Sequence, residues 1–404
     1  MLIVVESRLR KAGLLLTGLG FVSLYFAFAL REFLAYSSST SPDVERLQKA
    51  VRLAPGNAKY HEKLGRMIFL AHNDVASAAE EYRIASNLNP HNAQYWLELA
   101  SARRILDDDA GQRYALERAI EADPTTPDVA WEAANFFLVQ GETDKALREF
   151  HMVVAGDPSQ APTALQLAMH VADVDTILRQ VLPPVPDAYL MFIEQLTSVH
   201  DSAGAEKAWV ELVRLGKPFE KYRALQYVDY LIQQKDIGRA RIVWNQTAQL
   251  CGLGAYLASR DNLVVNGGFV SDILNKGFDW RYRKQGGVEV ALDPTDLHEG
   301  HRSLSISFNG NGVTEAGIFQ FVPVDPEATY DFSAYYKSDN LEAVGGPRFA
   351  VQDAYTNVTY FLSDDLKDAG VWRLASGHFK TSADAQLVVL RVLRVPEGGP
   401  IRGK

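Results

Sequence analysis

The chain has 404 residues, of which 47% are hydrophobic and 23% are charged, and its formal net charge is −9. This length predicts two or three domains, and the apolar fraction is that of a folded protein, which excludes a wholly disordered chain. Acidic residues outnumber basic ones by 50 to 41, which argues against a nucleic-acid-binding protein. The single cysteine, Cys251, excludes an internal disulfide framework and a cysteine-based zinc cluster.

The first 35 residues contain an apolar stretch that fits a membrane span. Residues 12–30 form an uncharged run of 19 residues, which as a helix would cover about 28 Å, close to the thickness of a bilayer core. Arg8, Arg10 and Lys11 precede this run, so the positive-inside rule predicts a cytoplasmic N-terminus. We therefore expect a single-pass protein of a bacterial inner membrane with a periplasmic or otherwise extracytoplasmic body. The alternatives are a signal peptide cleaved near Ala27-Phe28-Ala29 and a buried helix.

Residues 36–41 are serine-rich, and we expect them to form a short linker. Beyond the linker the sequence repeats, since Pro55, Pro90, Pro124 and Pro158 are separated by 35, 34 and 34 residues. Three of the units carry small residues at matching places, with large aromatic residues further along. These small and aromatic residues are Gly65, Ala100, Ala134, Tyr82 and Phe150. The period and these positions resemble tetratricopeptide repeats, in which each unit is two helices joined by a tight turn.

This resemblance implies an α-solenoid over residues 42–255, with five or six units and an interruption at the prolines of 183–186. A single unit cannot bury its apolar face alone, so successive units must stack. Such arrays bind a peptide or partner protein in their inner groove, which the first helix of each unit lines. The groove candidates on those helices are Arg103, Arg104, Trp131 and Asn135.

From Asn262 onward the hydrophobic period changes to two, with turn residues between short runs. Apolar residues alternate with polar ones over 288–293, 303–308 and 330–337, and further strands are expected at 318–324, 348–354, 359–362, 371–380 and 386–395. Many short strands separated by turns predict an antiparallel β-sandwich or jelly roll over residues 256–404. The fold class is therefore multidomain, α then β: a transmembrane helix, an α-solenoid and a β-sandwich.

The sandwich segment also resembles a family. Its opening, 262–269, the Gly-x-x-Trp of 277–280, the strand start at 300–304, the strand at 319–324 and the Gly-x-Trp of 370–372 resemble jelly-roll carbohydrate-binding modules of the galactose-binding-like superfamily. Two departures matter. Val270 replaces an acidic residue that can help to hold a structural calcium ion in this family. The chain also stops at 401–404, where the last strand of the family would begin, so that strand is expected to be missing.

A sugar site needs an aromatic side chain against the sugar ring and planar polar groups for its hydroxyls. Aromatic, amide and guanidinium side chains in the sandwich segment supply these properties. The glycan-binding candidates are Trp280, Tyr282, Tyr335, Gln352 and Arg391.

Catalytic and metal motifs are not found. His298-Glu299-Gly300-His301 has the wrong spacing for a His-Glu-x-x-His zinc site. No phosphate-binding glycine loop and no paired glycosidase carboxylates occur. We expect a non-enzymatic protein with no catalytic residues, no metal site and no cofactor, the calcium ion of the resembled family being the one open question.

Together these features favour a membrane-anchored scaffold of the bacterial cell envelope. Its repeats would bind a partner protein and its sandwich a glycan, in the assembly or export of a surface polysaccharide. The alternative is an assembly factor whose sandwich is structural or protein-binding, with no sugar ligand.

Overall fold

The computed structural model of the protein describes residues 7–394 and 399–404, and residues 1–6 of the expected N-terminal tail lie outside it. The chain divides after Pro183, at the proline interruption, into two compact units. Among the described residues, the first unit contains helices only. The second contains two helix pairs and all the strands.

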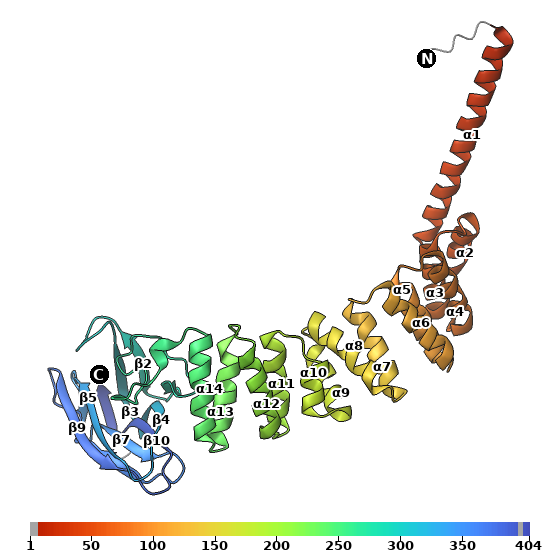
Figure 1. Ribbon diagram of the computed structural model, residues 1–404. Coiled ribbons are helices and arrows are strands. Elements are labelled where there is room, and N and C mark those ends of the chain that lie inside the picture. Colours follow the sequence, from red (N-terminus) through yellow and green to blue (C-terminus); the bar gives the residue numbers. More distant parts are fainter. Residues whose placement is uncertain (1–6, 395–398) are drawn as a thin grey trace. The chain divides into compact units, whose positions relative to one another are not determined.

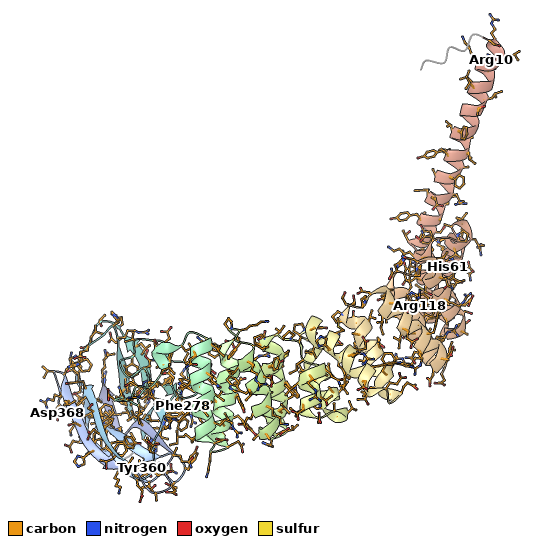
Figure 2. All side chains as sticks on the ribbon, in the orientation of Figure 1. Arg10, His61, Arg118, Phe278, Tyr360 and Asp368 are labelled. Atoms are coloured by element: carbon orange, nitrogen blue, oxygen red, sulfur yellow. The ribbon has the colours of Figure 1, made fainter. Side chains whose placement is uncertain are left out.

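Helix α1 (Arg8–Ser39) is the one helix among the described residues that is long and apolar enough to cross a membrane. It contains the whole of 12–30, and the side chains of this stretch stand out into solvent (Figure 2). The helix extends into the segment expected to be a linker, 36–41. Packing contributes to this extension, because Ala35 is buried against α2 (Val44–Leu53). The Ser38 hydroxyl donates to the Leu34 carbonyl at 2.8 Å, so its polar group is satisfied within the helix.

Four helix pairs complete the first unit and confirm the expected helix–turn–helix period (Figure 1). Each pair is one repeat, and the second helix of one pair packs on the first helix of the next. The pairs are α3 (Ala58–His72) with α4 (Val75–Leu88), α5 (Ala93–Ile105) with α6 (Asp109–Ala122), α7 (Pro127–Val139) with α8 (Thr143–Gly156), and α9 (Ala161–Val171) with α10 (Val174–Gln180).

Local side-chain contacts explain why the repeated residues form these pairs. Asn57 caps α3 by accepting from the Lys59 amide at 3.1 Å, which satisfies a free donor of the first turn. A Cβ on Gly65 would lie 2.9 Å from the Tyr82 ring, so the glycine permits the close approach of α3 and α4. The indole of Trp96 donates to the carbonyl of the repeat proline Pro90 at 2.9 Å.

The second unit begins with two further helix pairs. The described chain therefore contains six such pairs, in agreement with the five or six units that the sequence predicts. The two further pairs are α11 (Pro186–Ser198) with α12 (Ser202–Arg214), and α13 (Lys221–Gln233) with α14 (Ile237–Leu250). A short 3-10 helix, η1 (Gly254–Tyr256), leads into the strands. The strands are β1 (Arg281–Tyr282), β2 (Val288–Asp293), β3 (Ser303–Gly312), β4 (Glu315–Pro323), β5 (Thr329–Tyr336), β6 (Glu342–Ala343), β7 (Pro347–Asp353), β8 (Thr359–Leu362), β9 (Arg373–Lys380), β10 (Leu387–Arg394) and β11 (Pro400–Gly403).

The strands form the expected antiparallel sandwich (Figure 1). One sheet has five strands in the order β1-β4-β10-β7-β8, and it lies against a four-stranded sheet, β2-β3-β11-β6, and the β5-β9 pair. The core draws on every one of these sheets, with Ile318 of β4, Leu390 of β10, Phe332 of β5 and Ile401 of β11 among its members. Burial of these apolar side chains is the main force that holds the sheets together.

The C-terminal residues correct one expectation. The final strand was expected to be missing, yet β11 pairs with β3 on one side and with β6 on the other. Ile401 is fully buried in the core, and the Lys404 ammonium donates to Asp293 at 2.6 Å. Residues 400–403 therefore form a paired strand of the four-stranded sheet.

The last helix pair packs directly on the sandwich. The ring of Trp244 in α14 meets Phe278 edge-on at 5.8 Å. Gly277 lies beside this ring with φ +57°, and any Cβ there would collide with it. Asp229 of α13 accepts from the Gly277 amide at 2.8 Å and also bonds the guanidinium of Arg281. The α13–α14 pair and the sandwich thus share one junction of apolar and charged contacts.

The opening segment of the sandwich is held by buried polar groups. The Asn266 carbonyl accepts from the Trp280 indole at 3.2 Å, and the Gln320 amide donates to the Val265 carbonyl at 2.8 Å. Asp279 is fully buried and accepts from the Leu274 amide at 2.6 Å. Its burial raises the pKa of this carboxyl from 3.8 to about 6, because the charged form loses its hydration.

We predict that Asp279→Asn stabilises the sandwich above pH 6. The folded state holds the Asp279 proton more tightly than the unfolded chain, so wild-type stability falls as the pH rises from about 4 to about 6. The neutral amide removes this penalty, which is about 3 kcal/mol. Denaturation midpoints at pH 4 and pH 8 should differ less for the variant than for the wild type. The exposed Asp261→Asn serves as the control, and an equal gain at both pH values would contradict the prediction.

Candidate functional site

The exposed side of the five-stranded sheet gathers a continuous set of aromatic and polar side chains, which we call the outer face. In antiparallel strands, residues directly opposite one another point to the same side. One row across the sheet is Arg281, Phe319, Arg391 and Ala350, and the next is Phe321, Val389 and Gln352. A third row is Glu315, Leu393 and Arg348. The intervening residues, including Ile318 and Leu390, point into the core.

Two phenylalanines form the apolar centre of the outer face. The rings of Phe319 and Phe321 are half-buried and meet edge-on at 5.5 Å. The Arg281 guanidinium lies 4.9 Å from the Phe321 ring centre and that of Arg283 lies 5.1 Å from the Phe319 ring centre. Gly317, with φ +76°, lets the Arg283 backbone approach β4. Each ring therefore carries a cation against its face, which is a favourable arrangement.

A hydrogen-bonded network of planar side chains lies beside these rings. The Arg391 guanidinium donates to Glu315 at 3.2 Å and also to the side-chain oxygen of Gln352. The Gln352 amide donates to the Thr359 hydroxyl at 2.9 Å. About a third of the Arg391 and Glu315 side chains remains exposed, so the network is accessible to solvent. Planar donors and acceptors next to aromatic rings are the groups that sugar hydroxyls need.

The structure separates the five glycan candidates into three places. Gln352 and Arg391 bond one another on the outer face. Trp280 is only 8% exposed and its indole donates to the Asn266 carbonyl, so it lies in the core and not on the outer face. Tyr282 also packs against the core, from β1. Tyr335 lies on the two-stranded sheet, β5-β9.

Tyr335 belongs to a second aromatic group. Its ring is half-exposed and stacks on His298 at 3.7 Å, with Trp372 edge-on to the same histidine at 5.8 Å. His298 lies in the segment between β2 and β3, and the Lys337–Asp296 ion pair at 2.8 Å ties this segment to the residue that follows β5. Tyr335 therefore has a packing partner of its own, away from the polar network.

Sequence reasoning missed most of the outer face. Phe319 and Phe321 flank the buried Gln320, and their alternation with it was the available signal for an exposed pair. Glu315, Arg281 and Arg283 become neighbours only through strand pairing between β1, β4 and β10. Their separation along the chain hides this proximity.

The groove candidates of the first unit mostly contact the repeats themselves. Arg103 donates to Asp108 at 3.0 Å and braces the turn between α5 and α6. Trp131 packs 6.5 Å from the ring of Phe150, and the Asn135 amide donates to the Trp131 carbonyl. Arg104 is exposed.

Another set of residues recurs with the repeat period. Leu70, Ile105 and Val139 occupy the last turns of α3, α5 and α7, and they are 68%, 50% and 83% exposed. Their spacing of 35 and 34 residues equals that of the repeat prolines. An aliphatic side chain exposed at the same place in three successive repeats is a candidate contact row for a partner.

No group of three or more His, Cys, Asp or Glu side chains that could hold a metal ion occurs within residues 7–394 and 399–404. Helical repeats and β-sandwich binding domains are non-catalytic kinds of fold.

Comparison with known protein families matches one part of the chain. The family model of the carbohydrate binding domain matches residues 261–395, which confirms the resemblance of the sandwich segment. None of the curated proteins compared with the chain matches it.

Solved structures that resemble the chain include helical-repeat proteins. One is MamA (TM-score 0.29, 17% identity, covering 46% of this chain and 91% of that one). Another is YrrB, described as a TPR protein with an unusual peptide-binding site (TM-score 0.27, 14% identity, 43% and 75%). A third is PilF of Pseudomonas aeruginosa (TM-score 0.27, 17% identity, 55% and 91%).

Proposed function

We propose that this protein is a non-catalytic, membrane-anchored scaffold of the bacterial cell envelope that binds a glycan through the outer face of its sandwich. The observation that carries the proposal is the pairing of Phe319 and Phe321 with the Arg391–Gln352–Glu315 network on one solvent-accessible face. The match of this segment to a carbohydrate binding domain supports the same ligand class. A role in assembling or exporting a surface polysaccharide would join this face to the repeats and the membrane helix.

The second candidate is an assembly factor with no sugar ligand. This candidate is favoured because Arg391 and Gln352 already hydrogen-bond to each other, so these side chains have partners without a ligand. If the outer face is purely structural, removal of one phenylalanine ring changes no binding affinity, because the face binds no ligand. Direct binding measurements separate the two candidates.

We predict that the full chain in detergent binds immobilised polysaccharides and that Phe319→Ala and Gln352→Ala each weaken binding about tenfold or more. Loss of a polar contact to a ligand, or of a ring that supports a ligand-binding guanidinium, costs about 1–3 kcal/mol. Tyr335→Ala, on the other sheet, is the control and should bind as the wild type does. A glycan array read by fluorescence provides the measurement. Absence of binding by the folded chain would establish the second candidate instead.

The membrane proposal concerns α1. Its apolar surface is exposed along 12–30, which favours burial in lipid, and the basic residues before it favour a cytoplasmic N-terminus.

We predict that a protease added to intact spheroplasts degrades residues 40–404 and leaves a membrane-bound N-terminal fragment. In inverted inner-membrane vesicles the same body should be protected. Immunoblotting of a C-terminal tag follows the body in both preparations, and a tag at the N-terminus detects the membrane-bound fragment. Protection in spheroplasts would place the body in the cytoplasm, and a soluble body in intact cells would indicate a cleaved signal peptide.

The repeats would bind the partner protein through the row formed by Leu70, Ile105 and Val139. We predict that a photo-crosslinking residue placed at any of these three positions captures the same protein in cells. A crosslinker at Glu121, which is exposed on α6, is the control and should capture it poorly. Equal capture from Glu121 and from the row would refute a docking surface at this place.

A further inference from the structure

The outer face is basic although the whole chain is acidic. Four arginines lie on this face or stack against its rings: Arg281, Arg283, Arg348 and Arg391. Among the described residues of the face, Glu315 is the single carboxylate. The formal net charge of the chain is −9. A local excess of cations on an acidic protein points to a ligand of opposite charge.

Two of the four guanidiniums are neutralised and two are not. Arg391 pairs with Glu315, and Arg281 pairs with Asp229 from α13. Arg348 donates to the Ser363 carbonyl, and no carboxylate partner of Arg348 or Arg283 occurs within the described part of the chain. Arg283 is also exposed. These two charges are available to a bound anion.

Hydrogen-bonding capacity on the face shows the same imbalance. The Nε atoms of Arg281, Arg348 and Arg391 are buried and have no hydrogen-bond partner among the described residues. These atoms are closed to solvent, so a ligand would meet the terminal N–H groups of the four guanidiniums, and these donors outnumber the acceptors of Glu315 and Gln352. A carboxylate supplies acceptors only, and it matches a guanidinium with two parallel hydrogen bonds.

The positions of Arg281 and Arg283 also disfavour a neutral sugar as the ligand. A neutral pyranose stacks its C–H surface on a free aromatic ring. Here a guanidinium lies about 5 Å from the centre of each phenylalanine ring and occupies stacking surface. Each ring instead supports a planar cation whose remaining N–H groups can meet an anion.

Resting on the glycan-binding function proposed above, we propose that the outer face recognises an acidic polysaccharide, one whose sugar rings carry carboxylate groups. Arg283 and Arg348 bind the carboxylates. The Arg391–Gln352 pair binds ring hydroxyls. Asp229 acts as a positioning residue, because it holds Arg281 against the Phe321 ring and so joins the last helical repeat to the binding face.

The test uses the full chain in detergent and polymers that differ in charge alone. Polygalacturonate, alginate and hyaluronate are each compared with their methyl-esterified forms by isothermal titration calorimetry. We expect at least one free-acid polymer to bind tenfold or more tightly than its ester, and Arg283→Gln to abolish this preference. Arg348→Gln is the second variant should the first fail to fold, and the exposed Arg373→Gln on β9 is the matched control.

Each alternative result has a defined meaning. Equal binding of acid and ester forms, or binding of neutral glucans alone, would overturn the acidic specificity and leave glycan binding intact. Equally tight binding of a single-stranded DNA oligonucleotide would show a general polyanion surface and overturn it as well. Failure of the folded chain to bind any charged or neutral polysaccharide would refute the proposed function itself.

Discussion

The structure depends on one constraint: a helix pair leaves an apolar face that only the next structural layer can bury. In the first unit the next repeat supplies that layer, since the second helix of each pair packs on the first helix of the following pair. In the second unit the layer after α14 is the sandwich itself, which presents Phe278 and Gly277 to the ring of Trp244. The sandwich thus acts as the cap of the repeats that precede it, and it cannot be considered an appended domain on a free linker.

This cap has a consequence for binding. Asp229 lies in a repeat helix, yet its carboxylate is bonded to Arg281 and to the amide of Gly277 in the sandwich. Arg281 in turn lies against Phe321 on the outer face. A chain of direct contacts therefore runs from α13 to the candidate ligand surface. Since preorganised side chains lose less entropy on binding, a rigid repeat behind the face favours recognition of a ligand without rearrangement of these side chains.

The polar residues of the sandwich divide by the side of the sheet on which they lie. Gln320, Asp279 and Arg394 point inward, where each is buried and fixes loops or the opening segment, as when Arg394 donates to the carbonyls of Gly345 and Val313. Arg391 and Gln352 point outward, where they bond each other and stay partly exposed. Residues of the same chemical type thus lie in the core or at the surface according to strand register, because a shift of one position moves a side chain to the opposite face.

The sequence by itself determined the order of the parts: an apolar helix of membrane length, repeats with a 34-residue period, and a sandwich with strands such as 359–362 at the bounds observed. These follow from local periodicity, which the chain carries without reference to its neighbours. The sequence also identified Gln352 and Arg391 as candidates, and both lie on the outer face. It identified Trp280 as well, which is buried in the core, and no local sequence pattern reveals that burial. Tertiary structure alone decided that Phe319, Arg283 and Glu315 share a face with them, and that α14 rests on the sandwich. Strand pairing and docking bring together residues far apart in the chain, and their energy comes from contacts that do not exist until the chain is folded.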